Sequence, residues 1–437
     1  MTDQPLPEMP VATPAEESLE TPVRYETANR SQVELYPCDL EALLPPGHAA
    51  RLVWRFVEGL DLAAFSVGIR AREGRAGRPA IDPKILTALW LYATLDGVGS
   101  ARELARLCER HDAYRWLRGG VSVNHHTLSD FRVGHHAALD ALLTQSITAL
   151  LHRGIVTMAR VAQDGTRVRG SAGAGSFRRR ATLEECRRAA RRQVARTAQQ
   201  TDAPVNARVE AAQRRAAEER LARVEEALAQ LPAVEATKAR QADRAHTEAR
   251  VSTTDPDARV MKMADGGYRP AYNVHFATDV ESRVIVGVRT LNCGSDQSQM
   301  GPMLDAIRAR VGQVPQAHLV DGGFATKAEI TAAADRDVIV YMPPMSRAGG
   351  ARAPDQPVSG DPPAVAAWRA RMATAEAKTI YKARAATAEW VNADARTHRT
   401  LSRVLVRGLT KVHTWALWVA LAHNMMRTMQ IVPHLMT

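Results

Sequence analysis

The chain has 437 residues, 45% hydrophobic and 24% charged, so it can hold two or three globular domains with a substantial core. It contains no uncharged apolar run of about 18 residues, which argues against a membrane span. The net charge of +11 favours polyanionic partners. The four cysteines are scattered and have no CxxC spacing, which argues against a zinc site or a disulfide framework and indicates a cytoplasmic setting.

The first part of the chain is predicted to be a tail followed by helices. Residues 1–31 are rich in Pro, Glu and Thr and lack a secretory signal, which predicts disorder. Apolar residues at helical spacing predict helices after Asp82-Pro83 and after Ser100, and a third from Thr127 to Leu150. Short helices joined by glycine-containing turns suit a helix-turn-helix DNA-binding unit, and equally an all-α packing or dimerisation domain.

The period then changes, and a long polar insertion follows. Residues 155–168 predict a strand that runs through Asp164. The insertion covers 170–255, and residues 178–196 within it hold eight arginines. Leucine and valine spacing within 207–231 predicts a helical hairpin or short coiled coil. The arginine run is either a solvated helix face or a surface that tracks a phosphate backbone.

The second half alternates strands and helices. "AYNVHFATD" and "SRVIVGVRT" predict a β-hairpin, followed by a helix near 298–310 and a strand ending at Asp321. Another helix, the strand "DVIVYMP" and a Pro/Gly/Ala-rich loop at 343–364 precede the final helices. This order predicts an α+β fold, a mixed sheet flanked by helices as in ribonuclease-H-like domains, preceded by an all-α domain.

Three acidic residues stand in distinctive settings. Asp164 and Asp321 each end an apolar run and precede glycine, and Glu389 lies on a predicted helix. Each has an ordinary alternative, since aspartate before glycine often makes a turn and helical glutamates are usually solvated. Asp279 and Asp296 compete for the second position, but a hairpin turn and a helix cap explain them better. Carboxylates of this kind are the ligands that hard divalent cations prefer.

Several segments, in order, resemble bacterial insertion-sequence transposases of the DDE class, and the group named for insertion sequence 1182 in particular. They are "GRPAIDPKILTALWLYATLDGVGSARELARLC", "NHHTLSDFR", "VAQDGTRVRGSAG", "VSTTDPDARVMK", "GYRPAYNVHFATD" and "LVDGGF". The tail Tyr381-x2-Arg384-x4-Glu389-x6-Arg396 resembles the Tyr-Arg-Glu-Lys signature around the catalytic glutamate. Here Arg396 stands where lysine is usual, and the spacing from arginine to glutamate is one residue longer.

The resemblance spans roughly residues 32–428 and implies a domain plan. It places a helical DNA-binding domain at 32–152 and a ribonuclease-H-like catalytic domain at 153–430, interrupted by the basic helical insertion at 170–255. Asp164, Asp321 and Glu389 are then the catalytic residues and the ligands of two Mg²⁺ (or Mn²⁺) ions. Tyr381, Arg384 and Arg396 are expected to position DNA phosphates.

The implied activity is transposition. Such an enzyme binds the terminal inverted repeats of its element, cleaves the ends and transfers them into double-stranded target DNA by two-metal-ion phosphoryl transfer. A homo-oligomer in the synaptic complex and a nucleoid-associated location in a bacterial cytoplasm are expected. The alternatives are a metal-dependent nuclease without strand transfer and an inactive DNA-binding relic.

Overall fold

The computed structural model describes most of the chain beyond its N-terminal tail. The described residues are 31, 39–69, 71, 74, 79–199, 207–240, 247–345 and 355–432. Apart from Ser31, the tail predicted as disordered therefore lies outside the described residues. The described residues from Leu40 onward belong to one compact unit. None of the helices described in it is long and apolar enough to cross a membrane.

The segment before the first strand is helical, as predicted. Its elements are η1 (Glu41–Leu43), α1 (Ala49–Glu58), η2 (Ala63–Ser66), α2 (Pro83–Leu95), α3 (Ala101–Arg110), α4 (Asp112–Arg118), α5 (His125–Gly134) and α6 (His136–His152). Asp82 caps α2 by accepting from the Lys84 N–H, and the Ser100 hydroxyl accepts from the Glu103 N–H at the start of α3.

The prediction of one helix from Thr127 to Leu150 is wrong, because α5 and α6 are separate helices. His135 lies between them with ψ of 41°, outside the helical region. Gly134 weakens the helix just before this point. The His135 ring also packs against Phe65 and Phe131, with ring centroids 5.3 and 4.9 Å away. Tertiary packing of one aromatic cluster therefore overrides the continuous helical pattern.

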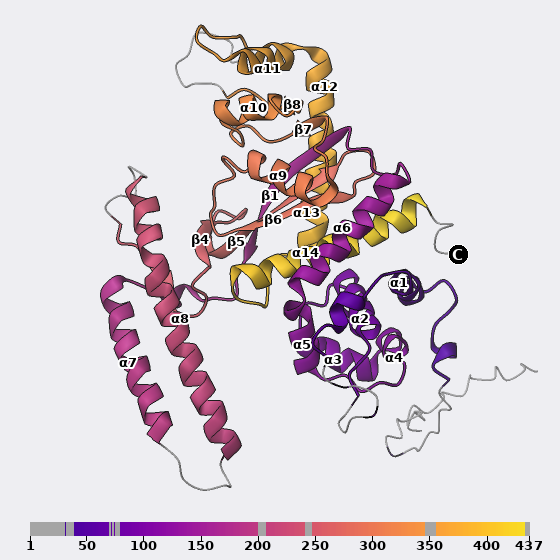
Figure 1. The fold of residues 1–437 in the computed structure, drawn as a ribbon, viewed down its shortest axis with the longest axis vertical. Helices are drawn as coiled ribbons and strands as arrows, with labels where there is room; N and C mark the ends of the chain where they lie inside the picture. Colours follow the sequence, from indigo (N-terminus) through magenta and orange to yellow (C-terminus); the bar gives the residue numbers. More distant parts are fainter. Residues whose placement is uncertain are drawn as a thin grey trace, which may run out of the picture. The chain divides into compact units, whose positions relative to one another are not determined.

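A six-stranded mixed sheet forms the centre of the second half (Figure 1). Its strands are β1 (Arg160–Arg169), β4 (Arg259–Lys262), β5 (Tyr268–Asp279), β6 (Ile285–Leu291), β7 (Ala317–Leu319) and β8 (Ile339–Tyr341). β5 pairs antiparallel with β1, β4 and β6, so the predicted β-hairpin is confirmed. β7 pairs parallel with β1, and β8 pairs parallel with β7. The first strand starts later than predicted, at Arg160, and runs well past Asp164.

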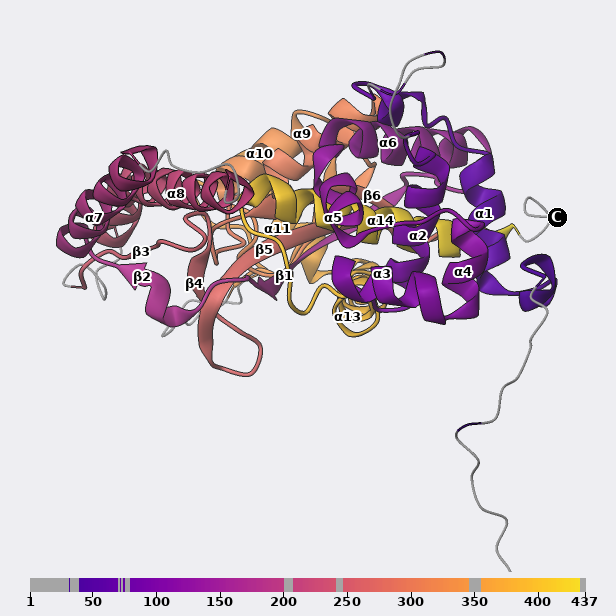
Figure 2. The ribbon, with the colours of Figure 1, turned by 90° about the horizontal axis from the view of Figure 1, so that it is seen from below.

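Helices cover both faces of this sheet. They are α9 (Met300–Val311), α10 (Lys327–Ala334), α11 (Pro363–Ala373), α12 (Ala375–Arg384), the π-helix η5 (Ala385–Glu389), α13 (Trp390–Thr397) and α14 (Leu409–Ile431). Figure 2 shows α9 and α13 on opposite sides of the strands. α14 packs on β6 and also contacts α2, α5 and α6, so one hydrophobic core joins the N-terminal helices to the sheet.

The polar insertion forms a helical hairpin, as predicted. η3 (Ala174–Ser176) and the short pair β2 (Phe177–Arg178) and β3 (Val251–Ser252) form its base; its long helices are α7 (Arg180–Gln199) and α8 (Ala207–Ala239). The two helices lie side by side (Figure 1). Ala217, Val224 and Leu231 are buried on α8 at seven-residue intervals, which is the spacing of a helix–helix seam.

Candidate active site

Asp164 lies in the interior of β1, with its side chain directed at the helices near the C-terminus. Its Oδ1 accepts from the Gly165 N–H at 2.9 Å and lies 3.0 Å from Arg384 Nη2. Its Oδ2 accepts from Asn392 Nδ2 at 3.1 Å. The Asp164 side chain is 20% exposed, so this carboxylate is only partly accessible to solvent. Three donors, the Gly165 N–H, Arg384 and Asn392, thus hold the Asp164 carboxylate in place.

Arg384 joins two of the three predicted carboxylates. Its Nη2 contacts Asp164, and its Nη1 lies 3.1 Å from Glu389 Oε1. In an α-helix, residues five positions apart point about 140° away from each other. Here η5 supplies a wider turn between the two residues, so Arg384 and Glu389 meet directly.

Asp321 stands two residues after β7, not at the end of the strand as predicted. The parallel register pairs Ala162 of β1 with Leu319 of β7, so Asp164 and Asp321 each follow this last strand pair by two residues. Asp321 is exposed, and its Oδ1 accepts from the Gly322 N–H at 2.8 Å. Its negative charge also acts on Arg384 and Tyr381, as does that of Glu389. Arg384 is thus within electrostatic reach of all three carboxylates.

The remaining predicted residues differ in their relation to the site. Tyr381 is half-buried at the end of α12; burial raises the pKa of its hydroxyl, and the nearby Arg384 charge opposes that rise. Arg396 shares no ion pair with Asp164 or Glu389 within the described residues, and its buried Nε has no hydrogen-bond partner there. Tyr381 therefore belongs to the cluster, whereas no described ion pair joins Arg396 to it.

Burial is the largest single influence on the pKa of both Asp164 and Arg384. It raises the pKa of Asp164, while Arg384, Gly165 and Asn392 act in the opposite direction. Burial alone would lower the pKa of Arg384, but the negative neighbours outweigh it, with Asp164 first, and the net shift is upward. The guanidinium is therefore firmly charged and is the main counter-charge of Asp164.

A buried polar network lies on the opposite face of β1, since neighbouring residues of a strand point to opposite faces. Gln163 Oε1 lies 2.9 Å from His318 Nε2, and Gln163 Nε2 lies 3.3 Å from His275 Nδ1. His275 Nε2 is 3.1 Å from Asp296 Oδ1, which also accepts from Asn273 Nδ2 at 2.6 Å. This network ties β1, β5 and β7 together directly behind the carboxylates.

The structure also shows what holds Asp296 and Asp279, the two aspartates that compete with Asp321 for the second acidic position. Asp296 has no contact with Arg384, and its carboxylate is held by His275 and Asn273 on the far face. Asp279 is fully buried at the end of β5, where it accepts from the Ser282 N–H and hydroxyl. Both residues serve structural contacts.

Asn392 is a residue that sequence reasoning missed. It follows Glu389 by three positions on a helix, which puts both on one face and could have identified it.

The three carboxylates supply oxygen atoms, which are the ligands that a hard divalent cation prefers. Their arrangement in the structure is not that of a metal site, because Arg384 stands between Asp164 and Glu389. Among the described side chains, no three of the types His, Cys, Asp and Glu lie close enough to hold a metal ion. For an ion to be shared by the three carboxylates, the guanidinium has to leave them.

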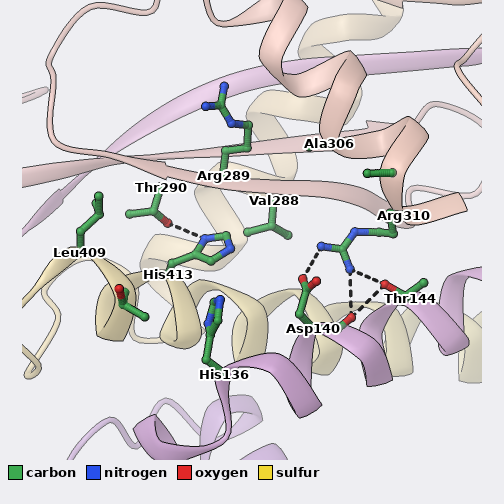
Figure 3. Close-up of a pocket in the computed structure, with 12 residues that line it drawn as sticks. His136, Asp140, Thr144, Val288, Arg289, Thr290, Ala306, Arg310, Leu409 and His413 are labelled. Carbon is green, nitrogen blue, oxygen red and sulfur yellow. Dashed lines mark hydrogen bonds and ion pairs between the residues drawn. The ribbon is translucent and has the colours of Figure 1, made fainter.

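A separate cavity of about 510 Å³ lies between α6, β6, α9 and α14 (Figure 3). Two histidines, His136 and His413, line it with ring centroids 5.3 Å apart. Burial lowers the pKa of His413 to about 4, so its ring is uncharged at neutral pH. Asp140 is the acidic residue of this cavity, and it is paired with Arg310. The cavity therefore lacks the free carboxylates that the proposed metal chemistry requires.

Two family models match the chain. One describes a transposase domain and covers residues 38–134, from just before η1 to the end of α5. The other describes a transposase DDE domain and covers residues 363–429, from α11 into α14, which includes Glu389. No curated protein and no solved structure matches the chain. The two matches support a transposase of the DDE type from an insertion sequence, an enzyme that acts on DNA.

Proposed function

We propose that the chain binds the terminal inverted repeats of its own insertion sequence, cleaves the ends and transfers them into target DNA. The observation that carries this proposal is the cluster around Arg384, which brings together Asp164 and Glu389 from distant parts of the chain. Asp321 follows the neighbouring parallel strand β7 by two residues, and its negative charge acts on Arg384. Membership of the group named for insertion sequence 1182 is part of the proposal.

The sheet supports a ribonuclease-H-like catalytic domain. Three antiparallel strands, β6, β5 and β1, are extended by the parallel strands β7 and β8. We assign catalysis to residues 153–430 and recognition of the transposon ends to 32–152. A homo-oligomer that holds two ends together completes the proposal.

Asp164, Asp321 and Glu389 would hold the Mg²⁺ or Mn²⁺ ions. Such ions activate the attacking oxygen and stabilise the leaving oxygen during in-line phosphoryl transfer. In this scheme Asn392 orients Asp164, and Arg384 exchanges its carboxylate partners for DNA phosphates, for which its planar donor fork is equally suited. Arg396 provides a second cation for the DNA backbone, and Tyr381 orients the strand.

Cleavage of DNA that carries the inverted repeats beside the gene tests the proposal. Asp164→Asn should abolish divalent-metal-dependent strand cleavage and leave end binding intact. Asp335→Asn, an exposed change at the end of α10, is the matched control and should cleave like the wild type. Cleavage by Asp164→Asn at the wild-type rate would contradict the assignment.

Two further measurements separate the alternatives. Pre-cleaved ends should join to target DNA; cleavage without joining would identify a nuclease, and no cleavage by the wild type would identify a relic. Titration with Mn²⁺, followed by the loss of the free-ion electron paramagnetic resonance signal, should show binding to the wild type and much weaker binding to Asp164→Asn. Equal binding by the two proteins would remove Asp164 from the ligand set.

A further inference from the structure

The second half of α7 carries an excess of positive charge. From residue 187 to residue 199 the helix contains five arginines and no acidic residue. Arg191 pairs with Glu225 of α8 at 2.8 Å. Among the described residues, no acidic side chain forms an ion pair with Arg188, Arg192 or Arg196.

These three residues form one exposed line, which we call the arginine stripe. Arg188, Arg192 and Arg196 are all exposed and follow one another at intervals of four residues. Each interval advances about 6 Å along the helix. Ala190 is buried against α8 and lies about half a turn from Arg188 and Arg192. The arginine stripe therefore faces away from the seam between the two helices.

An ordinary solvated helix face mixes both signs of charge, as α8 does. There, Arg214 and Arg215 have Glu218 and Glu219 within one turn. On α7, by contrast, Arg192 and Arg196 have no acidic residue within one turn of their own helix, and Arg188 has Glu184 and Glu185 only on its N-terminal side. A line of like charges on a folded surface is destabilising unless an anion covers it.

The hairpin is joined firmly to the framework of the candidate site. Gln230 of α8 donates to Asp257 Oδ1 at 2.6 Å and accepts from Arg259 Nη2 at 2.6 Å, at the start of β4. Asp257 Oδ2 also accepts from the Leu409 N–H at 2.8 Å, where α14 begins. The hairpin is thus attached both to the sheet and to the helix that covers it.

We propose that the arginine stripe binds the phosphate backbone of double-stranded DNA. The advance of about 6 Å per arginine is close to two phosphate steps of roughly 3.4 Å each along one strand. Guanidinium groups bind phosphates through paired hydrogen bonds, and such contacts fix the position of DNA without reading its sequence. The inference rests on the proposed function only in taking DNA as the ligand.

The salt dependence of DNA binding tests this role. The full chain and the variant Arg188→Gln/Arg192→Gln/Arg196→Gln are titrated with a fluorescent 30-base-pair duplex of arbitrary sequence at several KCl concentrations. Each phosphate contact contributes about 0.9 to the slope of log K against log salt, so the variant should lose about 2 to 3 of that slope. The matched control Arg208→Gln/Arg214→Gln/Arg215→Gln removes the same charge from exposed positions on α8 and should change the slope by less than about 1.

Equal slopes for the two triple variants would overturn the proposal. A second outcome would also overturn it: the stripe variant keeps the wild-type salt slope but no longer binds vesicles that contain phosphatidylglycerol. That result would identify a lipid surface as the ligand. The cleavage assay, run on the wild type and on the stripe variant at low salt, keeps the two proposals apart. Metal-dependent cleavage by the wild type together with equal salt slopes would overturn the stripe alone, and a reduced slope for the stripe variant beside a wild type that does not cleave would overturn the catalytic proposal alone.

Discussion

Removal of the Arg384 charge is the most direct test of the cluster. Arg384 is 8% exposed, Asp164 is 20% exposed and Glu389 is 58% exposed. Two unit charges 3 Å apart attract by about 5 to 6 kcal/mol at an effective dielectric constant of 20, before desolvation is subtracted. The pair with Glu389 is screened by water and contributes at most about 1 kcal/mol. We expect Arg384→Gln to lower the free energy of unfolding by about 2 to 4 kcal/mol at pH 7.5, mostly through Asp164.

The loss should depend on pH. Burial raises the pKa of Asp164 and Arg384 opposes the rise, so the pKa rises further in Arg384→Gln. The folded variant then binds more protons than its unfolded chain between the unfolded and folded pKa values of Asp164, and its stability falls as pH increases through that window. The deficit relative to the wild type should therefore shrink at pH 4.5, where protonated Asp164 needs no counter-charge.

Urea unfolding followed by tryptophan fluorescence measures both effects. The wild type, Arg384→Gln, Asp164→Asn and the double variant form a cycle, and we expect a coupling of about 2 kcal/mol between the two sites at pH 7.5. Arg384→Lys keeps the charge and should recover part of the loss. Additive effects within about 0.5 kcal/mol, or an equal deficit at both pH values, would refute the reasoning.

Three further predictions concern neighbouring features. Gly165→Ala should lower the free energy of unfolding, measured in urea, by about 1 to 3 kcal/mol, because its Cβ would lie within 2.9 Å of three polar side-chain atoms. Gly173 has open space around it, so Gly173→Ala should change that free energy by less than about 0.5 kcal/mol. Burial lowers the pKa of His413 to about 4, so the unfolded chain binds more protons than the folded protein between pH 6.5 and 4. Up to about 3 kcal/mol of stability should therefore be lost as the pH falls through that range. The variant His413→Gln should lose less stability over the same range, and a pH profile identical to that of the wild type would contradict this prediction. Asn392→Asp replaces a hydrogen-bond donor to Asp164 with a second carboxylate, so the free energy of unfolding should fall at pH 7.5 and recover at pH 4.5. A loss of stability that does not depend on pH would argue against a site shared by these two residues.

The sequence by itself determined most of the elements and their order. Caps at Asp82 and Ser100, the β-hairpin and the helical hairpin of the insertion all follow from local side-chain chemistry and hydrophobic period, and the structure has each of them. These features depend on residues within a few positions of one another, which is the range over which a sequence pattern carries information. The break at His135 was not predicted, because its cause is an aromatic contact with Phe65, far away in the chain.

Only the tertiary structure decided how the acidic residues meet. The wider turn of η5 aligns Arg384 with Glu389, and no residue pattern marked that turn. The register of β1 against β7 puts Asp164 and Asp321 each two residues beyond the pair Ala162 and Leu319, and it is fixed by pairing between strands that are far apart in sequence. The counter-charge of Asp164 comes from yet another element, α12. The strand register and the counter-charge depend on packing between distant segments, which the order of residues alone does not specify.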